Sequence, residues 1–153
     1  MTGVRGNTVD GVLRRSARRV PGRVALRYGE RSWTYAELDD AVSRAAQVLR
    51  DAGLGHGDRV GAYAHNSDAY LIGFLACSRA GLVHVPVNQN LVGDDLAYIV
   101  GQSGSSLVLA DPDIAPRLPG DVAGQAPRGR GGSPVGRGGG GAGGGGGGAR
   151  AAG

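Results

Sequence analysis

An alternation of short apolar runs and longer apolar segments constrains the fold of this chain more than any other sequence feature. The segments alternate between predicted strand and predicted helix in this order: residues 59–64, 68–79, 82–87, 94–102 and 106–110. Strands that alternate with helices of this length pair in parallel, because each crossover helix returns the chain to the same end of the sheet. The sequence therefore predicts an α/β fold that contains a βαβαβ parallel sheet.

The residues before this region predict a helix and a β-hairpin. Apolar residues at helical spacing, with arginines on the opposite side, predict an amphipathic helix that begins near Val9 and ends at Pro21-Gly22. We expect its basic face to be exposed to solvent, in preference to a targeting peptide or a membrane-surface helix. Two β-prone runs, residues 24–28 and 32–34, flank a glycine-containing loop, which predicts the hairpin.

A further helix is predicted directly after the hairpin. Thr34 and Glu37 have the spacing of a capping box, in which each side chain bonds the backbone N–H of the other residue. Apolar residues at helical spacing continue this helix to Ala52, and Gly53 ends it. Trp33 precedes the cap, so we expect its ring to pack on the first turns of the helix and not to stack on a ligand.

Residues 118–153 differ in composition from the rest of the chain. Beyond Leu118 nearly half of the residues are glycine, and Val122 and Val135 are the only larger aliphatic residues. Such a segment cannot bury enough apolar surface to offset the loss of chain entropy, so we expect it to be disordered. The predicted organisation is a folded region at residues 1–117, followed by a disordered Gly/Arg-rich tail at residues 118–153.

All 17 basic residues are arginine, and the formal net charge is +4. A basic chain can bind nucleic acid, but GC-rich codons produce the same lysine-free, Arg- and Gly-rich composition. The Arg-Gly repeats at residues 128–132 and 137–139 are similar to RNA-contacting segments, yet no aromatic residue lies among them. A non-enzymatic α/β binding protein whose tail contacts RNA is therefore the alternative hypothesis and not the favoured one.

Residue types that carry chemistry are few and widely spaced. No metal-ligand spacing relates the three histidines: His56, His65 and His84. Cys77 is a lone cysteine within a predicted apolar helix, where we expect a buried thiol. A P-loop needs a lysine, which the sequence lacks, and we expect Ser67 or Asn66 only to cap the following helix. We assign no catalytic, cofactor-binding or metal-binding residue.

Several motifs follow one another at a characteristic spacing. In chain order they are residues 26–31 (LRYGER), 33–38 (WTYAEL), 54–60 (LGHGDRV), 79–88 (RAGLVHVPVN) and 107–111 (LVLAD). This series resembles the opening of the adenylate-forming (ANL) superfamily, which includes acyl-CoA synthetases, aryl ligases and peptide-synthetase adenylation domains. Asn88 after Pro86-Val87 is closer to acyl-CoA synthetases, since amino-acid adenylation domains usually have an acidic residue there.

The resemblance implies an acid–thiol ligase that acts on a small carboxylic acid, with a fatty acid as the favoured substrate. Such enzymes use ATP and Mg²⁺ to form an acyl-adenylate and then transfer the acyl group to CoA. Their later motifs have no counterpart in this sequence: the phosphate loop that ends in Pro-Lys-Gly, the aromatic-Thr-Glu motif, the ribose-binding Asp and the C-terminal lysine. None of these functional residues can therefore be carried over to a position here.

From these departures we expect a truncated N-terminal domain that lacks adenylation activity by itself and binds ATP, Mg²⁺ and CoA poorly. The composition changes abruptly near Pro116, so we hypothesise that the tail is a frame-shifted or mis-called continuation of a GC-rich gene. The most apolar run, residues 69–77, is too short to span a bilayer, and the start of the chain lacks the apolar core of a secretory signal. We expect a cytoplasmic protein.

Overall fold

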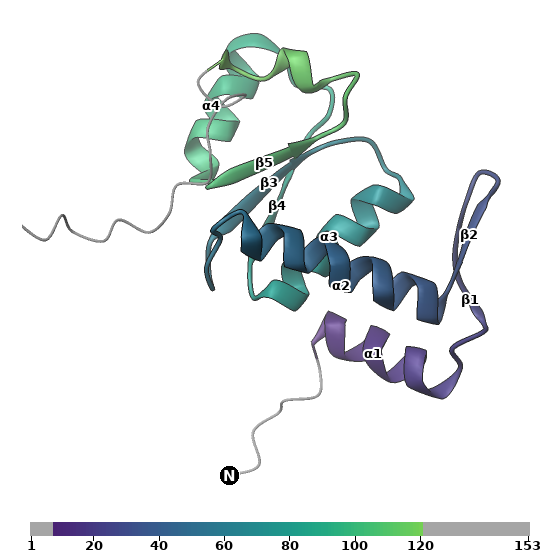
Figure 1. The fold of residues 1–153 in the computed structure, drawn as a ribbon. Coiled ribbons are helices and arrows are strands. Elements are labelled where there is room, and N and C mark those ends of the chain that lie inside the picture. The colour runs from purple at the N-terminus through teal and green to yellow at the C-terminus, as the bar shows by residue number, and fades with distance from the viewer. Residues whose placement is uncertain (1–7, 121–153) are drawn as a thin grey trace, which may run out of the picture.

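A parallel three-stranded sheet lies at the centre of the computed structural model, which describes residues 8–120 (Figure 1). The described elements, in chain order, are α1 (Val9–Arg19), β1 (Val24–Tyr28), β2 (Arg31–Thr34), α2 (Tyr35–Asp51), β3 (Arg59–Tyr63), α3 (Asp68–Ala80), β4 (Val83–Val87), α4 (Gly93–Ser103), β5 (Leu107–Ala110) and a 3-10 turn at Ala115–Arg117. The predicted α/β fold, with its hairpin, helix and βαβαβ unit, is confirmed. The predicted tail lies outside the described residues except for residues 118–120, so its disorder stays a prediction.

The strand order is β4-β3-β5, and β3 pairs in parallel with both neighbours. Helices cover both faces of this sheet: α2 and α3 lie on one side and α4 lies on the other (Figure 1). Pro86 is in β4, which is an edge strand of the described sheet. A proline is tolerated there because an edge strand has one side on which its N–H groups pair with no neighbour.

Alternation along β3 divides the core between the two faces of the sheet. Val60 is fully buried in a cluster that contains Leu49 of α2 and Ala76 of α3. Tyr63 faces the other way and is fully buried with Leu96 of α4, while its hydroxyl donates to the Leu91 carbonyl over 2.7 Å. Because both faces of β3 are covered, this strand reads as a continuous buried run, as parallel strands do.

The predicted helix ends are confirmed by their hydrogen bonds. Thr34 Oγ1 accepts from the Glu37 N–H at 3.2 Å, and a Glu37 carboxylate oxygen accepts from the Thr34 N–H at 2.8 Å, which completes the capping box. Ser67, and not Asn66, caps α3 by accepting from the Tyr70 N–H at 3.1 Å. Gly81 ends α3 with φ of +73°, a conformation that glycine adopts without a Cβ clash.

A third apolar cluster lies where α1 and the hairpin pack against α2 and α3, and it holds α1 and the hairpin in place. Leu13, Leu38, Val42 and Leu75 are buried there, and Trp33 packs against the same group. The predicted packing of Trp33 beside the first turns of α2 is therefore confirmed. The hairpin pairs antiparallel, with a register shift between Val24 and Leu26.

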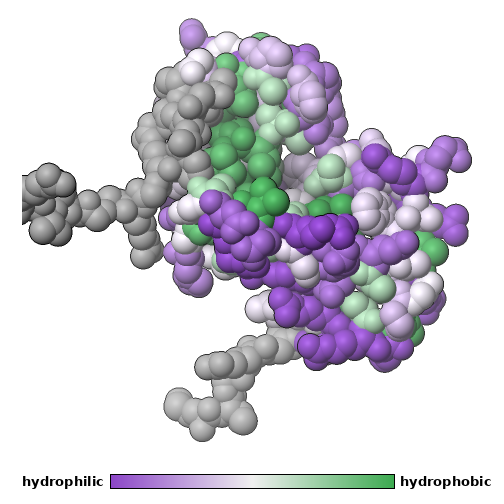
Figure 2. All heavy atoms as spheres, in the orientation of Figure 1, coloured by the Kyte–Doolittle hydropathy of each residue, from purple (hydrophilic) through white to green (hydrophobic). Residues whose placement is uncertain are grey.

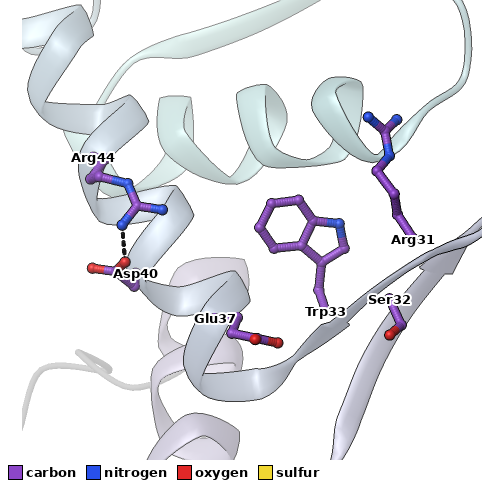
Figure 3. A pocket seen from close by; sticks show the side chains of 6 residues that line it. All are labelled: Arg31, Ser32, Trp33, Glu37, Asp40 and Arg44. Atoms are coloured by element: carbon purple, nitrogen blue, oxygen red, sulfur yellow. Dashed lines mark hydrogen bonds and ion pairs between the residues drawn. The ribbon is translucent and has the colours of Figure 1, made fainter.

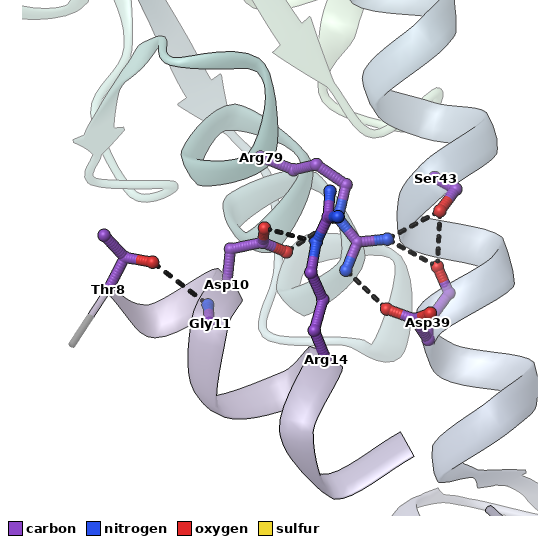
Figure 4. Close-up of polar contacts among 7 residues, drawn as sticks. All are labelled: Thr8, Asp10, Gly11, Arg14, Asp39, Ser43 and Arg79. Atoms are coloured by element: carbon purple, nitrogen blue, oxygen red, sulfur yellow. Dashed lines mark hydrogen bonds and ion pairs between the residues drawn. The ribbon is translucent and has the colours of Figure 1, made fainter. Parts of the chain in front are cut away.

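A buried arginine fastens three helices together on this side of the molecule (Figure 4). The Arg79 side chain, on α3, is only 3% exposed. Its Nε donates to an Asp10 carboxylate oxygen of α1 at 2.6 Å, and its Nη2 donates to the Asp39 carboxylate of α2 at 2.5 Å. Its Nη1 donates to the Asp39 carbonyl at 2.7 Å and to Ser43 Oγ at 2.6 Å. This contact fixes α1 relative to α2 and α3.

Among residues 8–120, no helix combines the length and the apolar character needed to cross a membrane.

Candidate functional site

The loops that follow β3 and β5 come together at the carboxyl edge of the sheet. The His65 N–H donates to an Asp111 carboxylate oxygen at 2.7 Å, and His65 Nε2 lies 3.0 Å from an Asp113 carboxylate oxygen. One potential ligand atom from each of His65, Asp111 and Asp113 lies within 4.8 Å of the others. Among residues 8–120, these are the three side chains that lie close enough together to hold a metal ion. In this structure Asp111 binds the His65 backbone N–H and Asp113 binds the His65 ring, and these bonds join the two loops.

The charge at this cluster is set by the pairing of His65 with Asp113. The hydrogen bond from His65 lowers the pKa of the Asp113 carboxyl, and the positive charges of His65 and Arg117 act in the same direction. His65 and Asp113 are 45% and 66% exposed in their side chains, so water screens this ion pair. The pairing therefore favours the carboxylate form of Asp113 at neutral pH.

A small pocket of about 150 Å³ lies beside the cluster, between α3 and the sheet. Ala62, Gly73 and Leu109 form apolar walls, while Tyr70, His84 and Asp111 contribute polar atoms. The His84 ring contacts the Tyr70 and Phe74 rings edge-on, with centroids 5.4 Å and 5.2 Å away. The His84 ring therefore packs against two aromatic side chains.

We expect His84 to make stability depend on pH. Burial lowers the pKa of His84 below its ordinary value of 6.5, because the cationic form is poorly solvated there. The unfolded chain then binds a proton more readily than the folded chain, so this contribution is full above pH 6.5 and is lost as the pH falls through the folded-state pKa.

The measurement compares urea midpoints at pH 7.5 and pH 5.5 for the wild type and for His84→Gln. The midpoint should fall less in the variant, because the glutamine does not titrate. An equal fall in both proteins would show that His84 contributes nothing to the pH dependence.

A second pocket, of about 330 Å³, opens between the hairpin and α2 (Figure 3). The Trp33 ring projects into the space between Arg31 of β2 and Asp40 and Arg44 of α2. Both arginines already have carboxylate partners: Arg44 pairs with Asp40, and Arg31 Nη2 donates to Asp68 at 2.7 Å. The pocket therefore offers an aromatic wall but no unpaired cation for an anionic ligand.

Asp68 is the most constrained polar side chain at this end of the fold. It is 2% exposed, and its two carboxylate oxygens accept from Arg31 Nη2 and from Trp33 Nε1, the latter at 3.0 Å. The Ala69 N–H also donates to it at 3.0 Å. Arg31 and Trp33 share one face of β2 because they are two residues apart. Asp68 therefore binds the hairpin to the start of α3.

The described helix starts near the sheet's carboxyl edge do not suit a triphosphate. The N-terminus of a helix can bind phosphate through its free N–H groups. However, Ser67 and Asp68 already occupy the first turn of α3, and Asp94 and Asp95 place negative charge in the first turn of α4. No lysine is available anywhere in the sequence to offset that charge. These two helix starts do not fit the phosphates of ATP, and we derive no catalytic step through it.

The assignment of no catalytic, cofactor-binding or metal-binding residue thus stays a prediction. The structure adds two polar groups that sequence spacing did not reveal: the His65 cluster and the Asp68 contacts. The partners within them are separated by 35–48 residues. The predicted carboxyl ends of β3 and β5 were the available signal for the first group. The Cys77 thiol is fully buried, as predicted, and burial raises its pKa to about 11.

A hairpin, a capped helix and a parallel βαβαβ unit follow one another along the chain, in the order that the resemblance to adenylate-forming domains implies. The profile of the AMP-binding enzyme family matches residues 13–130. The chain belongs to the AMP-binding enzyme family.

Similar proteins include two ligases that are much longer than this chain. The feruloyl-CoA synthase of Amycolatopsis sp is 40% identical over 72% of this chain and 23% of its own length. A medium/long-chain-fatty-acid–CoA and 3-oxocholest-4-en-26-oate–CoA ligase of Mycobacterium marinum is 35% identical over 65% of this chain and 18% of its own length. The chain therefore spans about a quarter of these relatives or less.

A solved structure supports the same family assignment. The N-terminal subdomain of NpsA from Klebsiella oxytoca, in complex with anthranilyl-AMSN, superposes with a TM-score of 0.67 at 31% identity. The match covers 74% of this chain and 29% of that chain. The described fold thus corresponds to part of an N-terminal subdomain.

Proposed function

We propose that this chain supplies the first part of a ligase that converts a carboxylic acid, with a fatty acid as the favoured substrate, to its acyl-CoA through an acyl-adenylate. The observation that carries the proposal is the family match over residues 13–130. The proposed reaction uses ATP, Mg²⁺ and CoA. We further propose that residues 1–117 are a truncated ligase domain and that residues 118–153 are a disordered Gly/Arg-rich tail, although the family match continues to residue 130.

Two observations support an acyl-CoA product over an aminoacyl-adenylate. Asn88 follows Pro86-Val87, as in acyl-CoA synthetases. In addition, two of the similar proteins described above are named as CoA-forming enzymes, one for ferulate and one for medium- and long-chain fatty acids. A test of acid preference therefore needs both fatty acids and a hydroxycinnamic acid.

The chemistry explains why we propose that the chain is inactive by itself. A carboxylate becomes a good electrophile only when its oxygen is part of a leaving group, and forming the adenylate brings two anions together. An enzyme must neutralise the charge that develops between them. The described helix starts carry acidic residues, and Arg31, Arg44 and Arg79 are already paired with carboxylates.

An RNA-binding role for the Arg-Gly tail is not favoured, since the family match accounts for most of the chain. The repeats lie outside the described residues. A cytoplasmic location is part of the proposal and follows from the expected metabolic role.

ATP–pyrophosphate exchange with the 153-residue chain tests the proposed inactivity. We expect no exchange above the enzyme-free rate with octanoate, palmitate or ferulate, because the described residues offer no triphosphate site. Sequencing the DNA beyond the codon for residue 118, read in all three frames, tests the ancestry. A frame that encodes the missing phosphate loop would support the proposal. Turnover by the chain alone would overturn the inactivity, and an uninterrupted frame without any ligase remainder would overturn the ancestry.

A further inference from the structure

The His65 cluster, formed by His65, Asp111 and Asp113, brings one imidazole and two carboxylates together at the carboxyl edge of the sheet. One potential ligand atom from each side chain lies within 4.8 Å of the other two. Sequence spacing assigns no metal ligand here, because the two aspartates lie 46 and 48 residues beyond the histidine. In Figure 2, hydrophilic side chains follow the loop that leaves β5, next to the apolar side chains over β5 itself. The folded chain therefore places a polar set of donors beside an apolar surface.

The imidazole distinguishes this cluster from an ordinary acidic surface. Mg²⁺ and Ca²⁺ prefer oxygen ligands, whereas an imidazole nitrogen together with carboxylate oxygens suits Zn²⁺ and its transition-metal neighbours. The two carboxylates also balance the charge of a divalent cation. Arg117 is the cation near enough to act on Asp113, but it is exposed, so water screens its charge. The donor types and the charge therefore fit a divalent transition-metal ion.

The distances within the cluster are close to those of a zinc site. Zinc–ligand bonds of about 2.0–2.2 Å place the ligand atoms of a tetrahedral site about 3.3–3.5 Å apart. The 3.0 Å between His65 Nε2 and the Asp113 carboxylate is slightly shorter than this, and the 4.8 Å limit for the whole set is longer. Shifts of about 1 Å at the side-chain ends would reconcile the two sets of distances. Asp113 is free to make such a shift, since its side chain is 66% exposed.

The backbone that carries the three side chains is held by hydrogen bonds that a bound ion would leave intact. The His65 N–H donates to an Asp111 carboxylate oxygen at 2.7 Å, and the Asp111 N–H donates to the Tyr63 carbonyl at 3.3 Å. The Asp111 carbonyl accepts from the N–H groups of Ile114 and Ala115 at 3.1 Å and 2.8 Å, which closes a turn directly after β5. Because the backbone is already ordered, binding an ion restricts only the side-chain ends.

We propose that His65, Asp111 and Asp113 bind a divalent transition-metal ion of the zinc class, with water in the remaining coordination position. The ion takes the place of the direct contact between the His65 ring and Asp113, and it joins the loops that follow β3 and β5. This assignment differs from the expectation, based on sequence spacing, that no residue binds a metal. The site is separate from the Mg²⁺ of the proposed ligase reaction and does not depend on that reaction.

Isothermal titration calorimetry with the complete 153-residue chain, made without a polyhistidine tag, measures the binding of Zn²⁺ alone. We expect saturable binding of one ion per chain. Mg²⁺ should bind at least about tenfold more weakly, because it keeps its water ligands and does not favour imidazole. Hydrogen exchange locates the site: the amides of residues 113–115 should exchange more slowly with Zn²⁺, since the ion stabilises the folded arrangement of both loops.

Two variants each remove one ligand. His65→Gln and Asp113→Asn should each weaken Zn²⁺ binding by about tenfold or more, because the loss of a residue that only orients a ligand already has an effect of this size. His56→Gln is the matched control: His56 is also exposed, but it lies in the turn before β3, at the opposite edge of the sheet. This control should leave the affinity unchanged. Circular dichroism checks that all three variants fold.

The contrary outcomes are specific. Absence of saturable Zn²⁺ binding, or equal affinity of the wild type and either ligand variant, would overturn the proposal. Equal binding of Mg²⁺ and Zn²⁺ would assign the effect to general attraction by acidic groups and would also overturn it. A loss in His56→Gln as large as that in His65→Gln would place the ion elsewhere, with the same consequence. None of these measurements involves ATP–pyrophosphate exchange, so failure of the proposed ligase function would leave the metal site standing.

Discussion

Replacing Asp68 with alanine should lower the free energy of unfolding by about 2–4 kcal/mol, because it removes the shared acceptor of two long-range hydrogen bonds. The Trp33 N–H would lose its partner at a half-buried position, and Arg31 would lose its carboxylate. Each bond to the charged carboxylate contributes more than a neutral hydrogen bond does. Urea unfolding followed by tryptophan fluorescence measures the change, since Trp33 is the single tryptophan.

Asp95→Ala is the matched control for this variant. Asp95 also lies in the first turn of a helix, but it is exposed and pairs with no side chain among the described hydrogen bonds and ion pairs. The Asp95→Ala substitution should therefore lower the free energy of unfolding by less than about 1 kcal/mol, which is the range for a charge near a helix start. Asp68→Asn should lie between the two, because its amide oxygen can still accept one bond. Equal effects of Asp68→Ala and Asp95→Ala would show that Asp68 acts only on the helix dipole.

The hairpin should respond locally as well. Without Asp68, the hairpin retains its own strand pairing and the packing of Trp33, but it loses its polar contact with α3. In Asp68→Ala, the backbone amides of residues 24–34 should then exchange faster than those of β3, whose hydrogen bonds lie in the core. Faster exchange in the hairpin would show that the Asp68 carboxylate holds the hairpin against α3, in addition to its effect on overall stability.

Local sequence signals were sufficient to predict the elements of this fold. The Thr34–Glu37 spacing predicted the start of α2, and the alternation of strands and helices predicted the parallel sheet. These signals work because caps, turns and periodicity act over a few residues. The ordered series of motifs also pointed to the family, which the match over residues 13–130 shows.

Contacts between distant residues could not be predicted in the same way. By its position alone Asp68 would only place a negative charge at a helix start, but its partners lie 35 and 37 residues earlier in the chain. His65 and Asp113 are 48 residues apart, and no short-range spacing relates them. Their meeting depends on the order β4-β3-β5, which places the ends of β3 and β5 side by side. The apolar groove between α2, α3 and β5 likewise forms only when the helices are packed on the sheet.

The contact of Arg79 with Asp10 could not be predicted from sequence spacing either, because the two residues are 69 positions apart. Two carboxylates from different helices converge on one guanidinium that is almost fully buried. Arginine suits this position since its planar fork presents several donors at once. Removal of the cation would leave Asp10 and Asp39 facing each other, and their repulsion would act to separate α1 from α2.

Arg79→Met should therefore lower the free energy of unfolding by about 3–5 kcal/mol, the range for breaking a buried ion pair from one side. Arg14→Met is the control, because Arg14 binds the same Asp10 carboxylate but is 49% exposed, and it should cost less than about 1 kcal/mol. Urea midpoints measure both values, and hydrogen exchange in α1 reports its release. A similar small cost for both variants would mean that Arg79 contributes packing alone and that apolar contacts through Leu13 hold α1.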